Sequence, residues 1–265
     1  MVTEGRPVRA AVQPSHTQPR LVTRDNSTAS ARSAPYRVIV NFGCGPTPAA
    51  ECLNIDGSLT VLLAKLPVPP YVFGRRAEFV RAVRLHRVKY ATARRLRFPE
   101  ASLDGFYSSH TLEHLPRGEC VSLLVRAYAW LRPGGVLRIV LPDLSHAALA
   151  YVSGAIDADT FVRRLRLSVE GQPWWSVVFG HAHHRWMYDT KSLARILEGI
   201  GYQEIKACEF RESRLNELAA LDMPERREES LYVEAIRPLS SAPADGKQQC
   251  ARNFPRAPFD LYNCR

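Results

Sequence analysis

The chain has 265 residues, 46% of them hydrophobic, and carries a formal net charge of +10 at pH 7. This length and apolar content allow one sizeable hydrophobic core, so we expect a single domain with tails rather than several domains. The excess of basic residues is consistent with an acidic partner or simply with a basic surface. The six cysteines include no C-x-x-C pair, which argues against a disulfide framework or a zinc site and indicates reduced thiols of an intracellular, cytoplasmic protein.

Both ends of the chain differ in composition from its middle. Residues 1–35 are rich in Ser, Thr, Pro and Arg and lack the apolar core of a signal peptide, so we expect a disordered leader. Residues 239–265 are polar and contain prolines, which predicts a flexible tail. The expected folded domain is 36–238, and its most apolar stretch, 59–73, is broken by Lys65 and three prolines, which argues against a membrane span.

A β-branched run, Val38 to Val40, predicts a buried first strand that leads into Gly43, Cys44 and Gly45. Glycine permits positive φ angles and lets a ligand approach the main chain, because it has no Cβ. Taken alone, the pattern fits a plain strand-to-loop turn better than a nucleotide site, since the third glycine of the dinucleotide fingerprint is absent.

A second short strand, 51–56, changes this interpretation because it ends on an acid, Asp56. A carboxylate at the tip of the neighbouring strand of a doubly wound sheet can accept hydrogen bonds from both ribose hydroxyls of an adenosine. The glycine turn and Asp56 therefore fit one ligand.

The next segment is strongly basic. Residues 58–74 are apolar and broken by prolines, and residues 76–88 have the periodicity of an amphipathic helix. Between residues 75 and 97 there are nine Arg or Lys residues against one acid. A solvated face explains this charge, and a site for phosphate, nucleic acid or anionic lipid is the alternative.

The middle of the chain alternates strands and helices. We expect strands at 89–93 and 103–109, a helix at 119–131 and a strand at 135–141. The alternation predicts an α/β fold with a parallel sheet covered on both faces. The strand 103–109 brings a set of polar residues to the carboxyl edge of this sheet, where such folds place ligands: Ser108, Ser109, His110, Glu113 and His114.

Residues 143–189 break this alternation. Helices at 144–153 and 158–169 precede a stretch rich in aromatic residues and histidines, which is typical of a lid or substrate-binding insertion. A helix at 190–199 and strands at 202–210 and 230–236 are expected to complete the sheet.

Five stretches resemble, in order and spacing, the class I S-adenosylmethionine-dependent methyltransferases: VNFGCGPTP, LNID, LRFPEASLDGFYSSHTLEHL, LRPGGVLRIVLPDL and HRWMYDTKSLARILEGIGY. The branch they resemble most is that of small bacterial methyltransferases often found near cell-surface polysaccharide genes. The resemblance covers about residues 36–238. It implies a Rossmann-like, doubly wound, mostly parallel sheet of seven strands with a reversed last strand, a helical and aromatic lid insertion, and S-adenosyl-L-methionine as the cofactor.

The resemblance also implies roles for single residues. The turn Gly43-Cys44-Gly45 would lie against the methionine part of the cofactor, Asp56 would hold the ribose, and Ser109 and His110 would border the methyl donor. Two cofactor-binding positions depart from the family, since Asn41 and Thr92 stand where relatives carry acids. A neutral hydrogen bond from Thr92 is weaker than a charge-assisted one, so we expect modest cofactor affinity or a contact from another residue.

Three histidines are the catalytic candidates: His110, His114 and His184. If His110 and His114 lie on one helix, their spacing of four places them on the same face, where they could act as a base or orient the acceptor. The alternative for His114 is a capping or packing role, and Glu113 is either a base or an acid stabilised by the helix dipole.

The second histidine group, His181, His183 and His184, lacks the spacing of a metal motif and has no acid beside it, so we predict no metal. We expect a substrate-facing loop there, with Trp186 and Tyr188 as walls. Trp174 and Trp175 could stack on an acceptor or pack within the lid, and Asp143 could touch the acceptor or cap the next helix.

These patterns lead to the hypothesis of a cytoplasmic methyltransferase that methylates an oxygen or nitrogen of a small molecule or glycan precursor. The basic helix favours an anionic acceptor. Methylation of RNA or protein is the enzymatic alternative, although no nucleic-acid recognition module accompanies the charge. A degenerate fold that binds a partner without catalysis is the other alternative, which Asn41 and Thr92 keep open.

Overall fold

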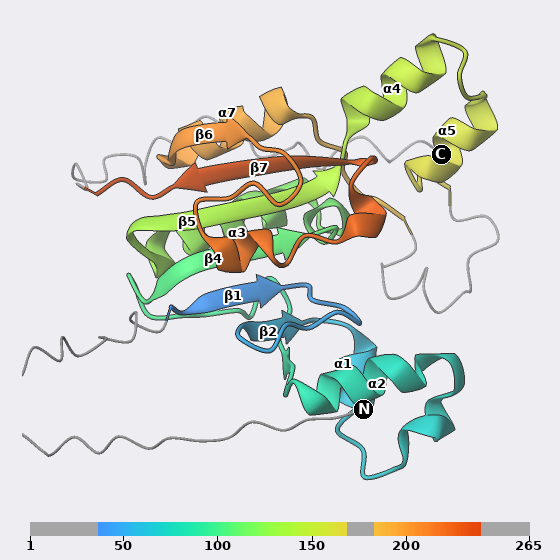
Figure 1. The fold of residues 1–265 in the computed structure, drawn as a ribbon, viewed down its shortest axis with the longest axis vertical. Helices are drawn as coiled ribbons and strands as arrows, with labels where there is room; N and C mark the ends of the chain where they lie inside the picture. Colours follow the sequence, from blue (N-terminus) through green and yellow to red (C-terminus); the bar gives the residue numbers. More distant parts are fainter. Residues whose placement is uncertain (1–36, 169–182, 240–265) are drawn as a thin grey trace, which may run out of the picture. The chain divides into compact units, whose positions relative to one another are not determined.

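The computed structural model describes residues 37–168 and 183–239. Its centre is one seven-stranded sheet with the strand order β3-β2-β1-β4-β5-β7-β6. The strands are β1 (Ile39–Phe42), β2 (Leu53–Asp56), β3 (Lys89–Tyr90), β4 (Leu103–Ser109), β5 (Leu131–Pro142), β6 (Gln203–Ala207) and β7 (Ser230–Ile236). The five strands from β3 to β5 pair in parallel, and β7 runs antiparallel to both of its neighbours. The predicted sheet with a reversed last strand is thus confirmed (Figure 1).

The predicted helices appear in the expected order. The helices are α1 (Leu59–Leu63), η1 (Pro70–Arg76), α2 (Ala77–Leu85), η2 (Leu112–His114), α3 (Arg117–Trp130), α4 (Leu144–Val152), α5 (Ala158–Arg164), α7 (Thr190–Ile200), α8 (Asn216–Ala219) and η3 (Pro224–Arg226). The short elements α1, η1, α8 and η3 were not predicted. Pro142 and Asp143 end β5, and the Asp143 carboxylate accepts a hydrogen bond from the backbone N–H of Ser145. Asp143 therefore caps α4, which is the second of the two roles expected from the sequence.

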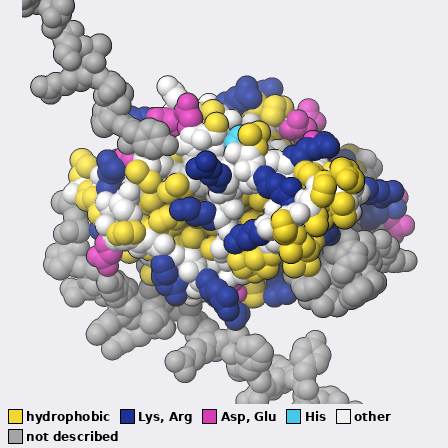
Figure 2. Space-filling model, turned by 90° about the horizontal axis from the view of Figure 1, so that it is seen from below, with side chains coloured by type: hydrophobic (Ala, Val, Ile, Leu, Met, Phe, Trp, Pro, Cys, Tyr) yellow, Lys and Arg dark blue, Asp and Glu magenta, His cyan; other side chains and the backbone are white. Residues whose placement is uncertain are grey.

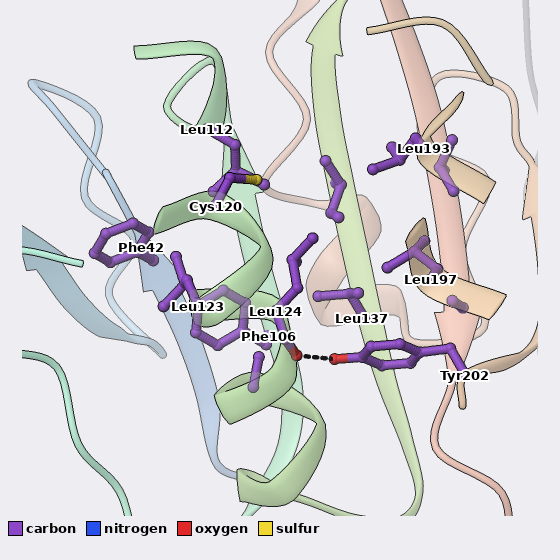
Figure 3. Close-up of a cluster of buried hydrophobic side chains, with 14 of the residues drawn as sticks. Phe42, Phe106, Leu112, Cys120, Leu123, Leu124, Leu137, Leu193, Leu197 and Tyr202 are labelled. Carbon is purple, nitrogen blue, oxygen red and sulfur yellow. Dashed lines mark hydrogen bonds between the residues drawn. The ribbon is translucent and has the colours of Figure 1, made fainter. Parts of the chain in front are cut away.

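Alternating side chains of the strands point into two cores. Phe106 of β4 packs in a large cluster with residues of α3 and α7, whereas its neighbour Tyr107 packs with Leu218 of α8 on the other face. Figure 3 shows the first cluster, in which the Tyr202 hydroxyl donates a hydrogen bond of 3.1 Å to the Leu124 carbonyl of α3. The sheet is therefore covered on both faces, as expected of an α/β fold.

A third cluster joins α1 and α2 at the β2–β3 edge of the sheet through Val61, Val80 and Val83. The Arg84 guanidinium of α2 donates hydrogen bonds to the carbonyls of Ala64, Leu66 and Val68, which lie at and beyond the end of α1. At least one residue of the basic segment thus has a structural role. Figure 2 views the molecule from this side and shows other Lys and Arg side chains among apolar ones.

A buried ion pair ties β5 to the chain before β7. Arg138 and Asp222 have fully buried side chains, and two hydrogen bonds of 3.1 and 2.5 Å join them. Arg138 also donates to the carbonyls of Glu209 and Glu212. The sequence analysis did not identify this pair, because its partners lie 84 residues apart.

Some expectations differ from the structure or lie outside the described residues. The strand β5 begins at Leu131, directly after α3, because the Pro-Gly-Gly stretch forms an irregular start with Gly134 at a φ of 78°. The expected leader, most of the tail, and Trp174, Trp175 and His181 lie outside the described residues. Within the described ranges, no helix has both the length and the apolar character needed to cross a membrane.

Candidate cofactor and acceptor site

A cleft of about 710 Å³ opens at the carboxyl ends of β1, β2 and β4. It is lined by all the residues proposed from the sequence to contact the cofactor: Asn41, Gly43, Cys44, Gly45, Asp56, Thr92, Ser109 and His110. These residues come from four separate segments of the chain. The parallel pairing of the strands brings them together, because the carboxyl ends of parallel strands meet at one edge.

The glycine turn has the geometry that requires glycine. Gly43 has a φ of 75° and Gly45 a φ of 52°, both in the left-handed region. The backbone N–H of Gly43 donates to the Ile55 carbonyl at 2.7 Å, which fixes the turn against β2. A Cβ on Gly43 would clash with the Thr111 side chain, whereas a Cβ on Gly45 would meet open space.

Asp56 is 7% exposed at the end of β2. Its Oδ2 accepts a hydrogen bond from the backbone N–H of Gly45 at 3.0 Å, and its Oδ1 accepts one from that of Ser58 at 2.7 Å. A carboxylate offers about four lone-pair positions, so each oxygen retains capacity to accept another hydrogen bond. Asp56 thus both orders the glycine turn and can accept from two neighbouring hydroxyls.

Asn41 is held by a residue that the sequence analysis missed. The Asn41 amide donates to Asn54 Oδ1 at 3.2 Å, and the Asn54 side chain also exchanges hydrogen bonds with the backbone of Ala49. Both side chains are buried. Asn41, which stands where relatives carry an acid, is therefore hydrogen-bonded to an amide side chain of the adjacent strand. This hydrogen bond joins β1 to β2.

His110 follows β4 in a left-handed conformation with a φ of 47°. Non-glycine residues adopt this conformation at an energetic cost, and they are found at functional sites more often than elsewhere. Its Nε2 lies 2.7 Å from the Ser230 hydroxyl. Burial lowers the pKa of His110 to about 3, and the positive charge of Arg226 is the second cause of this shift. The imidazole is therefore neutral at neutral pH.

Glu113 is the centre of a buried polar cluster beside the cleft. Its Oε1 lies 3.7 Å from His110 Nδ1, 4.0 Å from His114 Nε2 and 3.9 Å from His184 Nε2. Burial raises the pKa of the Glu113 carboxyl to about 8 and lowers that of His184 to about 4. The three proposed catalytic histidines therefore converge on one acid, although His114 lies in η2 and His110 outside it, so the two do not share a helix face.

The segment after the undescribed stretch is attached to this cluster by its backbone. The N–H groups of Arg185 and Trp186 both donate to the Glu113 carbonyl, and the His184 N–H donates to the Arg166 carbonyl. Contrary to expectation, Tyr188 does not line the cleft. It is 1% exposed within the first core cluster, since its backbone pairs with Asp143 beyond β5.

Comparison with known proteins identifies the family. A family described as "Methyltransferase domain" matches residues 15–207, which is most of the chain. The chain belongs to this family. It is an enzyme of the class I, S-adenosylmethionine-dependent methyltransferase type, and S-adenosyl-L-methionine is its cofactor.

Solved structures of methyltransferases resemble the chain only in part. An S-adenosylmethionine-dependent methyltransferase from Archaeoglobus fulgidus is 14% identical, with a TM-score of 0.43 over 76% of this chain and 86% of that chain. A possible histamine N-methyltransferase from Thermotoga maritima is 15% identical, with a TM-score of 0.43 over 77% and 84%. Phosphoethanolamine N-methyltransferase 2 from Haemonchus contortus is 14% identical, with a TM-score of 0.44 over 76% and 49%. No curated protein matches the chain.

The cleft of this methyltransferase fits its cofactor. The turn at Gly43 has no room for a Cβ and leaves backbone at the cleft, while Asp56 keeps acceptor positions for two hydroxyls. Thr92, Tyr90 and Phe79 line the same cleft near the β3 end. The cleft walls are thus polar at the glycine turn and Asp56 and more apolar near β3. An extended molecule with a charged amino-acid part, a ribose and an aromatic base fits this arrangement.

Proposed function

We propose that this methyltransferase transfers a methyl group to an oxygen or nitrogen of an anionic small molecule or glycan precursor. We also place it in the bacterial, polysaccharide-associated branch that its sequence resembles. The observation that carries the proposal is the convergence of the glycine turn, Asp56 and two arginines, Arg185 and Arg226, on one cleft.

The cofactor, when bound, supplies an electrophilic methyl group on a positively charged sulfur. The protein's task is then to align the acceptor for an in-line displacement, so most of the rate acceleration comes from positioning. We assign the turn Gly43-Cys44-Gly45 to the methionine part, Asp56 to the ribose, and Thr92 to the base. Ser109 and His110 border the place where the methyl group is transferred.

The acceptor end of the cleft is basic. Arg226 is half-buried and Arg185 exposed, and both line the cleft next to His110 and His114. A guanidinium binds phosphate or carboxylate oxygens in a bidentate manner, which a lysine does not do. These two side chains support an anionic acceptor more directly than the basic face of α2, where Arg84 serves the packing of α1.

The histidine cluster is suited to an acceptor that must lose a proton. His110 is uncharged and lies beside the cleft, so it can accept a hydrogen bond from a hydroxyl or amine. We propose that His110 and His114, which line the cleft, orient the acceptor, while His184 acts from behind them through Glu113.

Calorimetric titration with S-adenosylhomocysteine tests the cofactor site. We expect Asp56→Ala to weaken binding by about 10- to 100-fold, a loss of about 1.4 to 2.8 kcal/mol, because the ribose hydroxyls lose their acceptor. Asp159→Ala, which changes an exposed acid of α5, is the matched control and should bind like the unmodified protein. Equal affinity of the Asp56 variant and the control would remove Asp56 from the site.

A second experiment tests the acceptor. Labelled S-adenosylmethionine is supplied with nucleotide-linked sugars, phospholipid-linked glycans, uncharged sugars and RNA. We expect transfer to an anionic sugar compound, and we expect Arg226→Gln to raise its KM about 10-fold or more with a smaller change in kcat. Arg87→Gln, at an exposed position after α2, is the control. Methylation of RNA, with strongly salt-dependent binding, would instead support the nucleic-acid alternative.

A further inference from the structure

The Glu113 carboxyl group is not satisfied by the described protein atoms around it. The Glu113 side chain is 1% exposed, and in the described part of the chain neither of its oxygens has a hydrogen-bond partner. A buried carboxyl group without a partner destabilises the folded state, because it has lost its hydrogen bonds to water and gained none in the protein. The three imidazole nitrogens at 3.7, 3.9 and 4.0 Å from Oε1 are too distant for hydrogen bonds.

The ring orientation of His114 sharpens this problem. Its Nδ1 lies 3.1 Å from the His183 carbonyl oxygen. A carbonyl oxygen only accepts hydrogen bonds, so Nδ1 carries the proton, and in the neutral ring Nε2 has the lone pair. That lone pair faces Glu113 Oε1 at 4.0 Å, a separation too long for a hydrogen bond from a protonated carboxyl group.

His184, from another part of the chain, also faces the Glu113 carboxyl group. Its Nε2 lies 3.9 Å from Glu113 Oε1, and its ring packs edge-on against that of His114, with 5.0 Å between the centroids. The backbone contacts of His184 and Arg185 fix this position before any ligand binds. One ligand atom each from Glu113, His114 and His184 lie within 4.8 Å of one another.

This donor set has the chemistry of a metal site. Two imidazole nitrogens and one carboxylate oxygen are a known ligand set of zinc, with metal–ligand distances of about 2.0–2.2 Å and therefore about 3.4 Å between ligand atoms. The present separations from Glu113 Oε1 are 3.9 and 4.0 Å, and the whole set lies within 4.8 Å, so the side chains would have to move inward by a few tenths of an ångström up to about 1.4 Å to reach that value. The hydrogen bond from His114 Nδ1 to a backbone carbonyl is the outer contact that metal-bound histidines usually make.

We propose that Glu113, His114 and His184 bind a divalent first-row transition metal ion such as Zn²⁺, with one coordination position open toward the cleft. The carboxylate comes from η2, which is why the spacing of His181, His183 and His184 alone predicted no metal. Hard ions such as Mg²⁺ and Ca²⁺ prefer all-oxygen sites and are not expected to bind here.

The inference deepens the proposed function, and its role for an acceptor rests on that proposal. His114 lines the cleft, so an ion at this position would lie beside it and would polarise an acceptor oxygen or nitrogen. The binding of the metal itself can be measured without the cofactor or an acceptor.

The test is calorimetric titration of the full-length protein with Zn²⁺, Mn²⁺ and Mg²⁺, together with the zinc content after dialysis. We expect one Zn²⁺ per chain, no Mg²⁺ binding, and affinity at least about 100-fold lower in both Glu113→Gln and His184→Gln. His146→Gln, which removes an exposed histidine of α4, is the matched control and should keep full affinity.

Binding of S-adenosylhomocysteine by every variant checks that the fold is intact. The proposal is overturned if Zn²⁺ does not bind, or if it binds equally well to Glu113→Gln, His184→Gln and the control; in that case a proton fills the gap. Failure of the unmodified protein to bind S-adenosylhomocysteine would contradict the proposed function and leave the metal result standing.

Discussion

At the residue scale, Gly43 and Gly45 share a left-handed backbone and differ in the space beside them. We expect Gly45→Ala to lower the free energy of unfolding by about 1–2 kcal/mol, the cost of this conformation for an L-residue. Gly43→Ala should lower it by about a further 1–3 kcal/mol, because the new methyl group would clash with the Thr111 side chain.

Urea unfolding of the two variants measures this difference directly. The comparison is internally controlled, since both substitutions add the same group at positive φ within one turn. Equal stability of the two variants would show that Thr111 moves aside at no cost, and that the turn is less rigid than its contacts indicate.

At the element scale, two buried tyrosines differ in one hydrogen bond. The Tyr202 hydroxyl donates to the Leu124 carbonyl and links the start of β6 to α3 (Figure 3). The Tyr232 hydroxyl of β7 is buried and has no partner within the described residues. We expect Tyr202→Phe to lower the free energy of unfolding by about 1 kcal/mol and Tyr232→Phe to leave it unchanged or raise it.

Chemical denaturation of both variants tests this prediction. A loss of stability in Tyr232→Phe as large as that in Tyr202→Phe would indicate that the Tyr232 hydroxyl also has a partner, such as a water molecule.

At the scale of the whole molecule, the cleft joins segments that are distant in sequence. Asp56, His110 and Arg226 line it from β2, the end of β4 and η3. Because unfolding separates these segments, a ligand that needs all of them should stabilise the folded state. We expect S-adenosylhomocysteine at 100 times its Kd to raise the free energy of unfolding by about 2.7 kcal/mol.

Thermal unfolding with and without the ligand measures this stabilisation. For a chain of this size the Tm should rise by about 5–10 °C. Asp56→Ala, tested at the same ligand concentration, should show a smaller rise, because its Kd is higher. An unchanged Tm of the unmodified protein at saturating ligand would contradict binding in this cleft.

The order of the elements was largely predictable from local patterns. The β-branched run before Gly43, the strand ending at Asp56 and the basic helix around Val80 all lie close to their expected positions. Each signal depends on the periodicity or turn chemistry of a few consecutive residues. Since parallel strands place their carboxyl ends at one edge, these local signals also predicted which residues line the cleft.

The local patterns of the sequence therefore determined the sheet and the edge at which the cofactor candidates meet, and its resemblance to a known family implied the reversed last strand. Only the tertiary structure decided how polar groups pair across the chain. It joined Arg138 to Asp222, 84 residues away, and brought His184 to Glu113 in η2. The physical reason is that periodicity records which face of an element is buried, whereas the pairing of two buried polar groups depends on the path of the whole chain between them.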